Sequence, residues 1–88
     1  MTSKAEKLLE KMRQSPNNWK RNDLESLYTG FGFIIVNSRG PHDKVFHPNY
    51  PVLITSLPRH TELGIYNIRQ AIKLIERLKL LELSSKER

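Results

Sequence analysis

Hydrophobic positions in the first third of the chain recur at the spacing of α-helices. The first group falls on one helical face and comprises Ala5, Leu8, Leu9 and Met12. Ser3 and Glu6 have the spacing of a capping box at the start of this helix, and the turn-forming run 15–18 ends it. Trp19 follows, and we expect its indole to anchor the helix against the body of the domain.

A second helix and a first strand follow in the pattern. Asn22 and Glu25 repeat the capping spacing, and Gly30 and Gly32 stand where helices commonly end. The apolar positions of this short helix are Leu24, Leu27 and Tyr28. The run 33–36 is β-branched and aromatic and is too short for a helix between such breakers, so we predict a mostly buried strand.

The middle of the chain alternates between turns and short strands. The run 38–41 predicts a tight turn, in which Gly40 supplies backbone freedom and Pro41 a fixed φ. Strands are predicted over 42–47 and 52–55, with a Pro-Asn-Tyr-Pro turn between them. Because these connections are short, the three strands are expected to form an antiparallel meander.

The last part of the chain carries the longest amphipathic pattern. One helical stripe contains Ile65, Ile68, Ile72, Ile75 and Lys79, flanked by Ala71 and Leu78. The polar run 83–88 resembles a frayed terminus. The predicted fold is therefore a small two-layer α+β domain of order α-α-β-β-β-α with a three-stranded antiparallel sheet, and one sheet face or edge is left for a partner.

Composition limits the classes of function. A chain of 88 residues with 38% hydrophobic and 27% charged residues is one globular domain, and the absence of cysteine excludes disulfides and thiolate metal sites. The net charge of +6 favours a polyanionic partner such as nucleic acid, although basic residues spread over the chain also suit a solvated surface. The longest apolar run, 31–36, is too short to span a bilayer, and the polar amino terminus lacks a signal-peptide core, so we expect no membrane and a cytoplasmic location.

The histidines are the chemically active side chains that the composition offers. His42 and His47 differ by five positions and face opposite sides of a regular strand, so no metal site is expected, and no cofactor motif is present. Strand alternation puts His42, Lys44 and Phe46 on one face and Asp43, Val45 and His47 on the other. Neither face is wholly apolar, so either a bulge lies near the turn or Phe46 lies on an exposed binding face.

Several of these segments together resemble the HicA toxins. They are Gly40-Pro41-His42, Val45-Phe46-His47-Pro48, Thr55-Ser56-Leu57-Pro58-Arg59-His60, and Ile65, Ile68 and Ile72 on the closing helix. The resemblance divides the chain into an N-terminal helical extension (1–21), a HicA-like core (22–80) and a C-terminal tail (81–88). It implies a fold like the double-stranded-RNA-binding domain, an mRNA interferase activity in a type II toxin-antitoxin system, and a neutralising HicB-type antitoxin.

The resemblance also implies a set of site residues. His42 matches the catalytic histidine of the family, and it would move protons while the 2′-hydroxyl of RNA attacks the neighbouring phosphate, without a metal. By their positions, Arg39, Lys44 and Arg59 are the candidates for stabilising charge on that phosphate, and Gly40 lies beside them. Arg69 and Lys73, one turn apart on the last helix, are candidates for contacts to the RNA backbone.

Two other functions fit the same features. A non-catalytic RNA-binding module could grip RNA with the same charges and the same sheet and helices. A small adaptor could bind protein with its exposed sheet, in which case the positive charge is incidental. RNA cleavage separates the first alternative from an enzyme, and salt-insensitive protein binding without RNA affinity would favour the second.

Overall fold

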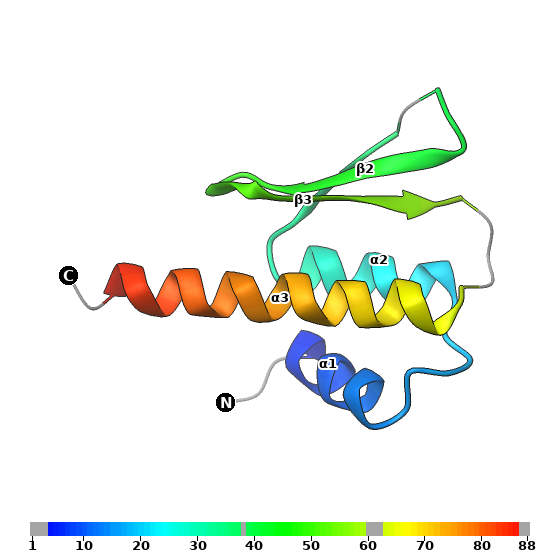
Figure 1. Ribbon diagram of the computed structural model, residues 1–88, viewed down its shortest axis with the longest axis horizontal. Coiled ribbons are helices and arrows are strands. Elements are labelled where there is room, and N and C mark those ends of the chain that lie inside the picture. The colour runs from blue at the N-terminus through cyan, green and yellow to red at the C-terminus, as the bar shows by residue number, and fades with distance from the viewer. Residues whose placement is uncertain (1–3, 38, 60–62, 87–88) are drawn as a thin grey trace.

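The computed structural model confirms the predicted fold class. It describes residues 4–37, 39–59 and 63–86, and its elements follow the order α-α-β-β-β-α (Figure 1). They are α1 (Lys4–Gln14), α2 (Arg21–Gly30), β1 (Ile34–Val36), β2 (His42–His47), β3 (Tyr50–Pro58) and α3 (Ile65–Lys86).

The three strands form one antiparallel sheet in the order β1-β2-β3. The register sets Ile34 opposite Phe46 and Phe46 opposite Ile54, and it shifts at a bulge between Phe46 and His47. In Figure 1 the sheet lies above α2 and α3, and α1 packs against these helices on the side away from the sheet. One face of the sheet is therefore covered by helices and the other is open.

The core lies between the sheet and the helices. Its fully buried side chains include Val45 and Leu53 from the strands and Leu27 and Ile75 from the helices. From α1, Leu9 and Met12 are also buried in this cluster, so the predicted extension forms part of the core. The Trp19 ring packs against the same cluster, as expected, and its Nε1 donates to the carbonyl oxygen of Ser15 at 2.6 Å.

Two helix boundaries differ from the sequence prediction. Helix α2 begins at Arg21 rather than after Asn22, because the Asp23 carboxylate accepts a hydrogen bond from the Lys20 backbone N–H at 3.0 Å. Helix α3 continues through 81–86 of the predicted tail, and the side chain of Leu81 packs against the core there. The predicted capping residue Ser3 and the end of the tail, 87–88, lie outside the described residues.

The prediction of a mostly buried first strand was wrong. Ile34 and Val36 are each 43% exposed, and Ile35 between them is partly buried against the core. The reason is the position of β1 at the edge of a sheet that has helices on one face only, so that alternate side chains face solvent. Strand β3 is longer than expected and spans Tyr50–Pro58.

The structure also decides which face of β2 is buried. Asp43, Val45 and His47 face the helices and are buried, whereas His42 and Lys44 are exposed on the open face. Phe46, partly buried, lies on that open face with them. The bulge is at the far end of β2 and not at the turn before it. Within the described residues, no helix combines the length and the apolar composition needed to cross a bilayer.

Candidate functional site

The start of β2 carries the two predicted site residues that share a face. His42 is exposed at the first position of the strand, opposite Pro58, and Lys44 is exposed two residues later, opposite Ser56. Because alternate residues of a strand point to the same side, the imidazole and the ammonium lie on the same open face. Arg39, three residues before His42, is also exposed.

Neither the backbone conformation nor the space around position 40 requires a glycine there. Gly32 is the glycine with a positive φ among the described residues, and a Cβ added at Gly40 would meet no atom within 4 Å. The expectation that Gly40 supplies special backbone freedom is therefore not supported. The open space around it leaves the backbone before His42 accessible to a ligand.

Arg59 belongs to an ion-pair network that surrounds the buried Asp43 carboxylate beneath the site. Its Nε lies 2.9 Å from the Asp43 carboxylate, and Arg21 donates to the other oxygen of that carboxylate at 2.5 Å. Arg21 also binds Glu25 and the carbonyl oxygen of Pro58, so it connects α2 to β2 and β3. These hydrogen bonds to Glu25 and Asp43 raise the pKa of Arg21, which keeps it charged.

The network explains how a carboxylate is tolerated on the core face of β2. Asp43 is 2% exposed, and each of its oxygens accepts from a guanidinium. Arg59 thus points to the helix-facing side of the sheet, with Asp43, while His42 and Lys44 face away from it. The contacts of Arg59 therefore hold the end of β3 to the start of β2. Its backbone N–H adds to them by donating to the Pro41 carbonyl oxygen at 3.3 Å.

Arg69 and Lys73 lie on a different part of the molecule. Both are exposed on α3, four residues apart and so on one helical face. Helix α3 covers the face of the sheet opposite to His42 and Lys44, and Gln70 ties it to β3 through a 3.1 Å hydrogen bond to Thr55. A ligand that reaches both groups of cations must pass around the β3 edge of the sheet.

His47 is buried, and its contacts serve the packing of the domain. It is 4% exposed, and its Nδ1 accepts a hydrogen bond from the backbone N–H of Asn49 at 3.1 Å. The Phe33 ring packs edge-on against it, with 5.1 Å between the ring centroids. Gly32 is needed beside it, because a Cβ there, at φ +92°, would lie 3.2 Å from His47 Nε2. His60 lies outside the described residues, so His42 is the exposed histidine of the part that the structure describes.

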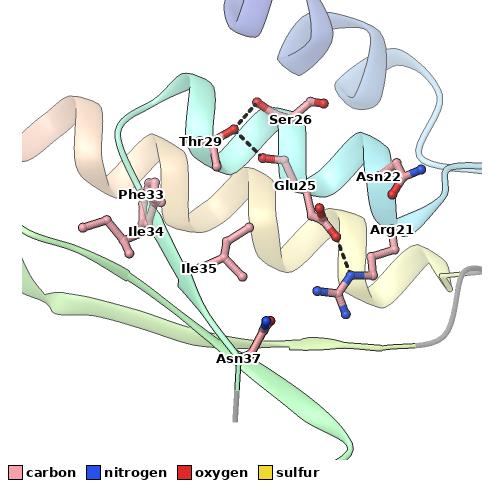
Figure 2. A pocket seen from close by; sticks show the side chains of 9 residues that line it. All are labelled: Arg21, Asn22, Glu25, Ser26, Thr29, Phe33, Ile34, Ile35 and Asn37. Atoms are coloured by element: carbon pink, nitrogen blue, oxygen red, sulfur yellow. Dashed lines mark hydrogen bonds and ion pairs between the residues drawn. The ribbon is translucent and has the colours of Figure 1, made fainter.

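Two hollows flank these residues. The larger, about 660 Å³, lies between α2 and β1 (Figure 2), where Arg21 and Glu25 bind each other and the Thr29 hydroxyl donates to backbone carbonyls. Three of its polar side chains, Arg21, Glu25 and Thr29, are therefore already paired. The smaller, about 280 Å³, lies on the open sheet face beside Lys44, and its walls are Lys44, Phe46, His47, Pro48, Pro51 and Ile54.

Sequence reasoning missed the Arg21–Asp43–Arg59 network and left the exposure of Phe46 undecided. The signal for the network was present as an aspartate at a core-facing position of a strand, which requires a cationic partner. Among residues 4–37, 39–59 and 63–86 no group of three or more metal-binding side chains is close enough to hold a metal ion. Comparison of the chain with protein-family models, curated proteins and solved structures finds no match.

Proposed function

We propose that the protein is an endoribonuclease, an mRNA interferase similar to the HicA toxins, with His42 as its catalytic residue and a HicB-type antitoxin as its partner. The observation that carries the proposal is the pairing of an exposed imidazole with an exposed ammonium on one face of β2. The resemblance of the segments around Gly40 and His42 to that toxin family supplies the reaction class. Action on mRNA would place the protein in the cytoplasm.

The proposed reaction uses the RNA as its own nucleophile. The 2′-hydroxyl oxygen forms a bond to the adjacent phosphorus while the bond from phosphorus to the 5′-oxygen breaks. His42 accepts the hydroxyl proton or donates a proton to the departing oxygen, and solvent water carries the other proton, since an imidazole exchanges protons near neutral pH. Lys44, on the same face, stabilises the charge that grows on the phosphate oxygens.

The decisive experiment compares His42→Ala with the wild type on a defined RNA. We expect the cleavage rate to fall by ~10² to 10⁴-fold, the usual contribution of a proton-transfer group. Chelator in both reactions tests for metal dependence, and the thermal midpoint should be nearly unchanged because the His42 side chain is exposed. Lys11→Ala, an exposed residue of α1 away from the sheet, is the matched control.

His47→Ala is not a suitable control, because it removes a buried ring that packs against Phe33. A His42→Ala protein that cuts RNA at the wild-type rate would refute the catalytic assignment. A wild type that binds RNA with no cleavage product would instead identify a non-catalytic RNA-binding module.

A further inference from the structure

The open face of the sheet combines exposed aliphatic side chains with positive charge. Ile34 and Val36 on β1 and Val52 and Ile54 on β3 are 43–64% exposed, and Phe46 lies between them on β2. Scattered apolar residues are ordinary on a protein surface, but here they are neighbours across three hydrogen-bonded strands. Such a face indicates a ligand with apolar surface.

The charged groups of this face have one sign. Its outward positions on the three strands include His42 and Lys44 and no carboxylate, since Asp43 faces the core. Along β2 the order on this face is His42, Lys44, Phe46, so a proton carrier, a cation and an aromatic ring follow one another at intervals of about 7 Å. The ligand that complements this order carries an anionic group next to a flat apolar group.

A nucleotide has this combination of groups. With the phosphate at His42 and Lys44, the adjoining base reaches the hollow of about 280 Å³, where Phe46, Pro51 and Ile54 offer apolar contact. Bases within a duplex are stacked on each other, and A-form RNA presents only its backbone and groove edges to a protein. An apolar hollow beside the phosphate site therefore suits an unpaired base. The stacked bases of a duplex would not enter it.

We infer that this hollow on the open sheet face binds an unpaired base of single-stranded RNA, next to the phosphate held at His42 and Lys44. The inference rests on the proposed function for the position of the phosphate and adds the substrate class. It departs from what a likeness to the double-stranded-RNA-binding domain implies, because the base is held by the sheet face and not by the helices.

The test measures binding separately from cleavage. A short fluorescent single-stranded RNA with 2′-O-methyl groups lacks the attacking hydroxyl, so its affinity can be measured at a fixed salt concentration without turnover. Phe46→Leu keeps an apolar side chain and removes the ring, and we expect it to weaken binding by about tenfold. Leu83→Thr, which changes an exposed apolar side chain of α3 outside both the open sheet face and the hollow, is the control and should leave affinity within about twofold.

Further arms identify what the hollow recognises. A fully abasic oligomer should bind wild type and Phe46→Leu equally, and a duplex of the same sequence should bind wild type more weakly than the single strand. If Phe46→Leu does not fold, as judged by its thermal midpoint, Ile54→Thr tests the neighbouring side chain of the hollow on β3.

Several outcomes would overturn the inference. They are wild-type affinity in both hollow variants, equal affinity for duplex and single strand, or no binding of single-stranded RNA by wild type. A fourth is a wild type that self-associates through this face, with hollow variants that become monomeric and keep full RNA affinity. The proposed function fails separately: it fails if His42→Ala retains cleavage, whatever the hollow variants show.

Discussion

At the scale of single residues, consecutive positions on β2 lie in opposite environments, one exposed and one buried. His42 faces solvent, whereas Asp43 is buried and accepts hydrogen bonds from Arg21 and Arg59. The strand can carry both because successive side chains point to opposite faces. The position of the proposed catalytic residue therefore depends on an ion-pair network on the other side of the same strand.

Replacing members of this network should affect stability unequally. Asp43→Ala leaves Arg21, whose side chain is 13% exposed, without one of its two carboxylates, and we expect it to cost ~3 kcal/mol of unfolding free energy. Arg59→Ala should lower the unfolding free energy by about 1 kcal/mol or less, because the Arg59 side chain is 44% exposed and the Asp43 carboxylate still pairs with Arg21 in this variant. Urea unfolding of the two variants measures the difference. Equal losses would mean that Arg21 does not depend on Asp43.

At the scale of elements, α2 joins the helix layer to the edge of the sheet. Arg21 at its first position binds Glu25, Asp43 and the Pro58 carbonyl, and Tyr28 near its end meets Phe33 edge-on at 5.4 Å. The Tyr28 side chain is buried, and this burial raises its pKa because the phenolate would lose its hydration. The attachment of α2 should therefore weaken in alkali.

The sign of the pH effect follows from the direction of that shift. The phenol of Tyr28 ionises in the unfolded chain near pH ~10 but stays protonated in the folded protein, so folding loses up to about 1.4 kcal/mol for each pH unit above that value. Below that pH the Tyr28 phenol is protonated in both states and its contribution does not change. Tyr28→Phe should accordingly raise the pH at which the protein unfolds, measured by circular dichroism during an alkaline titration. An unchanged alkaline midpoint would contradict the assignment of this loss to Tyr28.

At the scale of the whole molecule, some of the cations behind the net charge of +6 are bound in ion pairs and others are not. Arg13 pairs with Glu76 and Lys79 with Glu6, which holds α1 to α3. Four predicted RNA contacts have no carboxylate partner among the described residues: Arg39, Lys44, Arg69 and Lys73. These cations lie on the sheet side and on the helix side, so a bound RNA that uses all of them must wrap around the domain.

Salt dependence measures how many of these cations contact phosphate. If all four neutralise one phosphate each, the logarithm of the affinity for single-stranded RNA should fall with the logarithm of salt with a slope of about −3. Lys44→Ala should reduce the magnitude of the slope by about 0.7, and so should Lys73→Ala if RNA reaches α3. A flat salt titration would remove the electrostatic model, and a Lys73→Ala slope equal to wild type would confine the RNA to the sheet.

The candidate site was predicted from the sequence only in part. His42 and Lys44 were predicted on one face, and the structure places them there, because alternation along a strand is a local property. Arg59 was grouped with them on its position in the chain, but it is tied to Asp43. Arg69 and Lys73 were predicted on the last helix, and they lie on α3. The place of Arg59 depends on how distant segments pack, which no local pattern contains.

The sequence by itself determined the order of elements, the antiparallel meander and the buried positions Ile68, Ala71, Ile75 and Leu78 of α3, because periodicity, breakers and short connections act between near neighbours. Ile65, predicted on the same stripe, is 42% exposed. The tertiary structure alone decided which face of β2 is buried, since Asp43 is tolerated inside only where Arg21 from α2 and Arg59 from the end of β3 meet it. It also decided that β1 is an exposed edge and that Phe46 lines an open hollow. Those outcomes come from partners far apart in the chain, and their contacts exist only once the helices cover one face of the sheet.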